Sequence, residues 1–214
     1  MQTLGNSTVE RLLGFNQQVL DQALAVVGGH AVPSAPQHGA PPTAPPSLPP
    51  NVPPNVPPFS GPVGAHLRHV VEHYEALVKG LSFGVVDYDG RPRDRQLETC
   101  PTLARDRLLG LRQVLGQWSP DMLDRPVQVL GQGGITGDFD FCVTSSVGRE
   151  LAFLASHAVH HFALLAEHLQ GHGVAVPAHF GKAPGTVANE IATRRAAAPS
   201  DNKELACLSL SLSA

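Results

Sequence analysis

The segment SVGRELAFLASHAVHHFALLAEH, from Ser146 to His168, decides the predicted fold of this 214-residue chain. Its apolar residues recur at intervals of three and four positions, which is the pattern of an amphipathic helix. At 3.6 residues per turn, His157 and His161 lie one turn apart on the same face. Two imidazoles placed in this way can bind one metal ion, so the segment predicts a long helix that carries two metal ligands.

A second group of histidines lies earlier in the chain, in the segment HLRHVVEH from His66 to His73. His66, His69 and His73 fall on one side of another predicted helix. A lone histidine is more often solvated, or bonded to a backbone carbonyl, than bound to a metal. Because two helices each carry histidines on one face, metal ligation is the favoured interpretation.

Four helices are predicted, over residues 7–27, 63–81, 101–118 and 146–170. Prolines stand at favourable starting positions for the second and third helices, and Gly28 and Gly29 end the first. Between the third and fourth helices, alternating apolar residues flank a glycine-rich turn, which indicates a hairpin. The predicted fold is therefore all-α: a four-helix bundle with a short β-hairpin or extended excursion between its last two helices.

The predicted domain organisation follows from composition. Of the 20 prolines, 13 lie between Pro33 and Pro62, and proline has no backbone N–H for a helix or a sheet. The C-terminal residues are mostly small or serine. The predicted parts are an N-terminal helix of the bundle (1–31), a proline-rich disordered linker (32–60), the metal-binding core (61–187) and a disordered tail (188–214).

Charge and composition disfavour several classes of protein. The net charge is -3, with no basic stripe that would indicate nucleic-acid binding. No apolar run approaches the ~20 residues of a membrane span, and the first residues do not resemble a secretion signal, so a cytoplasmic protein is expected. Three widely separated cysteines argue against a disulfide framework and against a thiolate zinc site: Cys100, Cys142 and Cys207.

Two well-known helical metal motifs are absent from the sequence. No Glu is followed by His three residues later, which excludes the ferritin-like di-iron pattern. No His-Glu-x-x-His occurs, which excludes a zincin.

Three segments resemble the DinB/YfiT-like family of metalloenzymes: VGAHLRHVVEHY (Val63–Tyr74), VDYDGRPRD (Val86–Asp94) and the stretch from Ser145 to His161. The resemblance covers roughly Gly61 to Thr186. It implies a helical bundle, the metal ligands His69, His157 and His161, a divalent ion such as zinc, nickel or iron, and a homodimer. Some members are thiol-dependent transferases or isomerases, so the resemblance also allows a low-molecular-weight thiol as cofactor. The proline-rich segment departs from the family, which has a short connection there.

Three neutral imidazoles leave an open coordination position, as in catalytic zinc sites. The predicted function is a metal-dependent transferase or hydrolase that acts on a small molecule through a metal-bound thiol or water. Glu150 lies two turns before His157 on the same face and is the candidate catalytic residue, as proton acceptor or as orienter of a ligand. The alternative for Glu150 is a glutamate favoured near the helix start by the helix dipole.

The charged run from Asp87 to Glu98 favours a structural network of ion pairs over catalysis. Within it, Arg91 and Arg93 are candidates for binding an anionic substrate or cofactor. The alternative function is a non-catalytic protein, in which the histidines hold a structural ion and the proline-rich segment recruits a partner. A fourth ligand such as His73 would favour that alternative.

Overall fold

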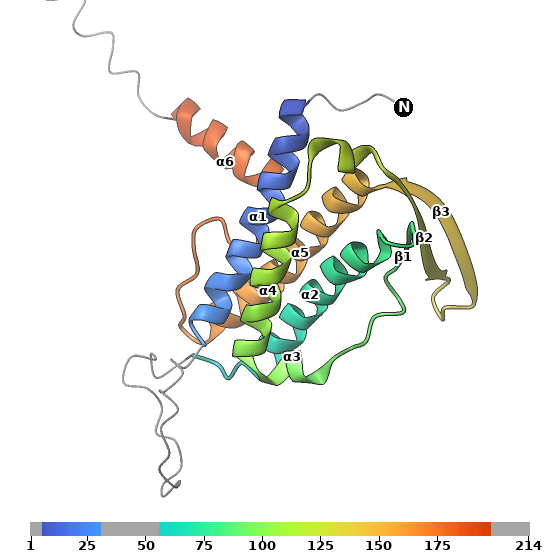
Figure 1. The fold of residues 1–214 in the computed structure, drawn as a ribbon. Helices are drawn as coiled ribbons and strands as arrows, with labels where there is room; N and C mark the ends of the chain where they lie inside the picture. Colours follow the sequence, from blue (N-terminus) through green and yellow to red (C-terminus); the bar gives the residue numbers. More distant parts are fainter. Residues whose placement is uncertain (1–5, 31–55, 198–214) are drawn as a thin grey trace, which may run out of the picture. The chain divides into compact units, whose positions relative to one another are not determined.

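The computed structural model describes residues 6–30 and 56–197 (Figure 1). Most of the predicted linker (32–60) and the end of the predicted tail (198–214) lie outside the described residues. The chain divides into two compact units, Met1–Gly181 and Lys182–Ala214. In the described part of the chain, we find no helix with the length and apolar character needed to cross a membrane.

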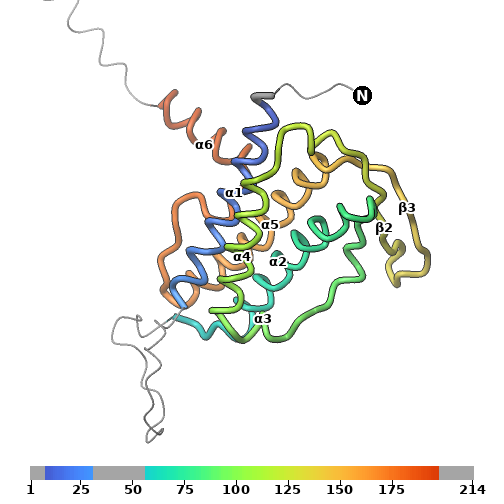
Figure 2. Tube along the Cα trace, viewed as in Figure 1, coloured from blue at the N-terminus to red at the C-terminus, as the bar shows by residue number. Residues whose placement is uncertain are grey.

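Helices make up most of the first unit: α1 (Asn6–Gly28), α2 (Pro62–Gly80), α3 (Arg95–Thr99), α4 (Pro101–Gly116) and α5 (Val147–Gly171), with a 3-10 turn at Pro120–Asp124. Helix α1 packs on α4 and α5, and α2 packs on α5 and α4 (Figure 2). Pro62 and Pro101 occupy the first turns of their helices, where a missing N–H costs little. Helix α5 begins where the Ser146 hydroxyl accepts the N–H of Arg149.

A three-stranded sheet adjoins α2 and α5, made of β1 (Val85–Asp87), β2 (Pro126–Gly133) and β3 (Phe139–Ser146) in the order β1-β2-β3 (Figure 1). Strands β2 and β3 form an antiparallel hairpin, in which Val129 lies opposite Val143. Strand β1 pairs in parallel with β2. The hairpin lies between α4 and α5, as the alternating sequence indicated, but the parallel strand was not predicted.

The predicted all-α four-helix bundle is wrong. The described residues contain six α-helices and a mixed three-stranded sheet, so the fold class is mixed. Strand β1 has only three residues, of which Val86 alone is buried. A segment this short shows no recognisable alternation of apolar and polar residues in the sequence. It lies against the end of α2 because Gly80 has no Cβ, and a Cβ there would meet the backbone oxygen of Val85.

The core of the first unit lies among its four long helices. Leu20 of α1 is fully buried, as are Leu67 of α2 and Phe162 of α5. The Tyr74 hydroxyl donates a hydrogen bond of 2.8 Å to Asn16, and both side chains are buried, so this bond joins α2 to α1. Helix α1 is thus part of the core although the proline-rich segment separates it from α2 in sequence.

The second unit contains helix α6 (Pro184–Ala197). None of its residues is buried, and Lys182 forms an ion pair of 2.8 Å with Glu190. The helix crosses the predicted boundary between the core (61–187) and the tail (188–214).

Candidate metal site

Histidines of α2 and α5 meet where these two helices pack against each other. His69, His157 and His161 each place one ring nitrogen within 4.8 Å of the other two. The described residues contain no second group of three His, Cys, Asp or Glu side chains with ligand atoms this close. These are the three residues that the sequence and the family resemblance gave as metal ligands.

The spacing of the nitrogens suits a small ion. His69 Nε2 and His157 Nε2 lie 2.9 Å apart, although the residues come from different helices. In a tetrahedral site, two nitrogens that each lie about 2.0–2.1 Å from one zinc ion are separated by roughly 3.3 Å. The two nitrogens therefore converge on a position that one divalent ion could occupy with little movement of the rings; without an ion, one of them donates a hydrogen bond to the other.

His66 contacts the third candidate ligand. Its Nδ1 lies 2.8 Å from Nδ1 of His161, so one of these two nitrogens donates a hydrogen and the other accepts it. When His161 is the donor, its Nε2 carries the lone pair that a metal needs. A hydrogen bond to the second ring nitrogen commonly orients a ligating histidine in this way. The sequence predicted that His66 lies on the same helix face as His69, but it did not predict the hydrogen bond between His66 and His161.

His73 lies beside the three-histidine group without belonging to it. Its Nδ1 donates a hydrogen bond of 2.6 Å to the backbone oxygen of His69, and its side chain is almost fully buried. Its ring centre lies 4.1 Å from that of His69 and 4.5 Å from that of His157. His160, by contrast, is exposed.

Burial keeps these imidazoles neutral. It is the main cause that lowers the pKa of His69 to about 2, with neighbouring histidines and Arg91 adding to the effect. The pKa of His161 falls to about 4, again mainly by burial. Burial lowers the pKa of His73 to about 4 against an opposing effect of its hydrogen bond to His69. Since the neutral imidazole is the form that binds a metal, the site is prepared for ligation at pH 7.

Two aromatic rings border the histidines on the side of the sheet. Tyr88, just after β1, stacks on His73 with ring centres 5.6 Å apart. Phe153 of α5 stacks on His157 at 5.5 Å, and the two aromatic rings also contact each other. Neither residue was a candidate from sequence, because each aromatic side chain taken alone indicates only core packing.

Glu150 is fully buried and holds the aromatic border in place. It accepts hydrogen bonds from the Tyr88 hydroxyl at 2.8 Å and from the Ser145 hydroxyl at 2.6 Å, and it pairs with Arg149 at 2.9 Å. Burial, followed by the charge of Glu150, raises the pKa of Tyr88. Among the described residues, no hydrogen bond joins Glu150 to a histidine. Its link to the site runs through Tyr88, and its role as a proton acceptor stays a prediction.

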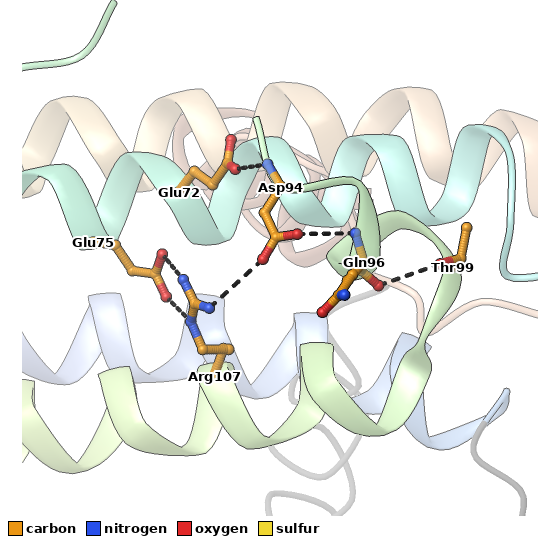
Figure 3. Close-up of polar contacts among 6 residues, drawn as sticks. All are labelled: Glu72, Glu75, Asp94, Gln96, Thr99 and Arg107. Atoms are coloured by element: carbon orange, nitrogen blue, oxygen red, sulfur yellow. Dashed lines mark hydrogen bonds and ion pairs between the residues drawn. The ribbon is translucent and has the colours of Figure 1, made fainter. Parts of the chain in front are cut away.

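The charged run after β1 does form the expected network with the helices (Figure 3). Glu72 is buried and accepts the backbone N–H of Asp94 at 2.6 Å. Arg107 of α4 pairs with Glu75 of α2 and lies 4.0 Å from the Asp94 carboxylate. Asp94 also caps α3 by accepting the N–H of Gln96. These contacts fix the loop against α2 and α4.

Arg91 and Arg93 differ in their surroundings. Arg91 is partly buried and donates from Nη1 to the backbone oxygen of Tyr88. Burial is the main cause that lowers the pKa of His69, His73 and His157, and the charge of Arg91 adds to it. Arg93 is exposed, has a left-handed backbone (φ 54°), and donates a long hydrogen bond to the backbone oxygen of Arg91. Of the two predicted arginines, the structure therefore places Arg91 near the histidines.

No family model matches the chain, and no solved structure matches it. The chain is similar to FK506-binding protein 5 of Rhizopus delemar, with 31% identity over 103 residues. The match covers 48% of this chain and 27% of the relative, so it spans about a quarter of that protein's length. These comparisons give no support to the DinB-like resemblance, and the four-helix bundle that the resemblance implied is contradicted by the sheet.

Proposed function

We propose that this chain binds a divalent metal ion through His69, His157 and His161 and acts as a metal-dependent enzyme on a small molecule. The observation that carries the proposal is the convergence of three ring nitrogens, from two helices, within 4.8 Å of one another. Zinc, nickel and iron are the expected ions, because imidazole ligands suit all three.

Two further features support an enzyme. Three protein ligands are typical of catalytic zinc sites, whereas structural sites use four. A divalent ion held by three neutral imidazoles can polarise a substrate or lower the pKa of a water or thiol. The aromatic rings of Tyr88 and Phe153 stack on His73 and His157 and give the site an apolar wall on that side. A low-molecular-weight thiol as the second reactant is part of this proposal.

The compartment is also a proposal. Both cysteines in the described residues, Cys100 and Cys142, are free thiols, which suits the cytoplasm. The name of the Rhizopus relative gives FK506 binding as a property of that protein. The match covers only 27% of that relative, so its name does not enter the proposed function, which rests on the histidines of this chain.

The test is metal analysis of the purified full chain, together with single histidine variants. We expect about one equivalent of metal in the natural chain and a loss of stoichiometric metal in His157→Ala and His161→Ala. His160→Ala is the matched control, since His160 is exposed on the same helix, and it should keep its metal. Equal loss in all three variants, or no metal in the natural chain, would contradict the proposal.

The second candidate function is a structural metal site with four ligands. Buried His73 lies beside His69, His157 and His161 and is the candidate for the fourth ligand. Its ring centre is 4.1 Å from that of His69. X-ray absorption of the zinc form counts the histidine ligands directly. The enzyme proposal predicts three histidines and a metal that His73→Ala retains. Four histidines, with metal lost in His73→Ala, would establish the structural site instead.

A further inference from the structure

We propose that two copies of this chain pair through strand β3, so that their sheets join into one continuous sheet. The strand order is β1-β2-β3, and β3 therefore forms the outer edge of the sheet (Figure 1). In the described part of the chain, β2 is the only strand that pairs with β3. The inference concerns assembly, and it does not depend on a metal ion.

Alternate residues of β3 direct their backbone groups away from β2. The N–H of Val147, directly after the strand, donates to the backbone oxygen of Arg125 and so continues the ladder between β2 and β3. The direction of N–H and C=O alternates along a strand, so the odd-numbered residues of β3 bond to β2. The N–H and C=O groups of Asp140, Cys142 and Thr144 consequently point to the free edge.

Strand β3 lacks the features that usually block such an edge. Natural sheets commonly protect a long edge with lysine, proline or a bulge. The sequence FDFCVTSS, from Phe139 to Ser146, contains no lysine or proline, and its register with β2 is continuous. Three apolar side chains on one face are exposed: Phe139 by 57%, Phe141 by 39% and Val143 by 50%. An open edge of this length can pair with another strand.

A second copy fits this edge in a register that uses all three outward-facing residues. When Cys142 lies opposite Cys142 of the second copy in an antiparallel pair, Asp140 of each copy lies opposite Thr144 of the other. Each of these pairs exchanges two N–H···O bonds, so the edge groups of both copies find partners. The next outward residue is Ser146, but it caps α5, and the carbonyl of a capping residue already accepts a helix bond.

Charge and side-chain contacts favour the same register. The one charged residue of β3 is Asp140. Centring the pair on Asp140 would place two carboxylates opposite each other, which destabilises a sheet, whereas centring it on Cys142 places a Thr144 hydroxyl there. On the other face, Phe141 lies opposite Val143 of the second copy, and such aromatic and β-branched pairs stabilise sheets. The edge is therefore complementary to itself, and a second copy is the partner that it fits.

Cys142 makes the pairing directly testable. Opposite residues of a hydrogen-bonded antiparallel pair have Cα atoms about 5.5 Å apart, which is within the range of a disulfide. In the variant Cys100→Ser, Cys207→Ser, we expect the oxidant diamide to link two chains through Cys142. Moving the thiol to the hairpin turn, by Cys142→Ser with Thr136→Cys, should slow the linking by about tenfold or more. Equal rates at the two positions would overturn the proposal.

Sedimentation equilibrium of the full chain, at several protein concentrations, measures the dimer in solution. Cys142→Pro removes an N–H that points to the free edge, so the bonds between β3 and β2 remain. This variant should weaken dimerisation by about tenfold or more, whereas Cys142→Ala keeps the N–H and should change it less than about twofold. Circular dichroism checks that Cys142→Pro folds. If it does not, amide hydrogen exchange of the natural chain decides the question.

Amide hydrogen exchange reads the edge without any substitution. In the dimer, the amides of Asp140, Cys142 and Thr144 should exchange about tenfold or more slowly than in the dilute monomer. The amides of Phe141 and Val143 bond to β2 and should be protected in both. A chain that stays monomeric at every concentration, or a dimer that Cys142→Pro leaves intact, would overturn the proposal. Edge amides protected in a monomer would also overturn it, since another segment of the same chain would then cover β3.

Discussion

Replacing Glu150 with alanine should destabilise the metal-free protein by about 3–6 kcal/mol. Glu150 is fully buried and accepts hydrogen bonds from the hydroxyls of Tyr88 and Ser145. Hydrogen bonds to a buried charged group contribute about 1.5–3 kcal/mol each, and their loss leaves the Tyr88 hydroxyl buried without a partner. The ion pair with Arg149 contributes less than about 1 kcal/mol, because that side chain is 66% exposed.

The assay is guanidinium unfolding followed by circular dichroism. Tyr88→Phe and Ser145→Ala each remove one of the two hydrogen bonds and should each cost about 1.5–3 kcal/mol. Glu167→Ala is the control, because Glu167 is exposed on the same helix, and it should change the free energy of unfolding by less than about 0.5 kcal/mol. The reasoning is refuted if Glu150→Ala costs no more than Glu167→Ala. Unchanged stability in Tyr88→Phe would show that the hydroxyl does not depend on Glu150.

Two other outcomes are expected. Leu20→Ala in α1 should cost about 2–5 kcal/mol in urea unfolding, because Leu20 is fully buried, and a cost below about 1 kcal/mol would mean that α1 does not pack on the core. The metal-free chain should lose stability as the pH falls from about 6.5 to 4. His73 and His161 have folded pKa values of about 4, so the unfolded state binds more protons in that range. Unfolding curves at pH 7, 5.5 and 4.5 measure this loss, and equal stability at all three would contradict the neutral, buried histidines.

The helices that carry the candidate ligands were predictable because their patterns are long. The apolar spacing of α5 extends over 25 residues, and the one-turn separation of His157 and His161 follows from helix geometry. The choice among the histidines of α2 was not determined by spacing. His69 was selected by the family resemblance, and the structure shows that His66 and His73 also contact the group.

The sheet and the polar partners of the site could not be predicted from local pattern. Strand β1 is three residues long and exists because β2 pairs with it across some 40 residues of chain. Glu150 was recognised, but its bond to Tyr88 spans 62 positions. A single sequence contains no signal for such a pair, since a buried carboxylate and a buried tyrosine can each bond to many kinds of backbone and side-chain group.

The candidate site is assembled from two kinds of structure, and this division has a chemical consequence. His69, His157 and His161 project from two long packed helices, which would give a metal ion fixed ligand positions. Arg91 lies in a loop, which tolerates substitution better than a packed helix. The loop is tied to α2 by the hydrogen bond from the Asp94 N–H to Glu72 and by the stacking of Tyr88 on His73. We expect Arg91→Gln to leave the imidazoles in place but to strengthen the proposed binding of a divalent ion, because it removes a positive charge near the histidines. Weaker metal binding in this variant would contradict the reasoning.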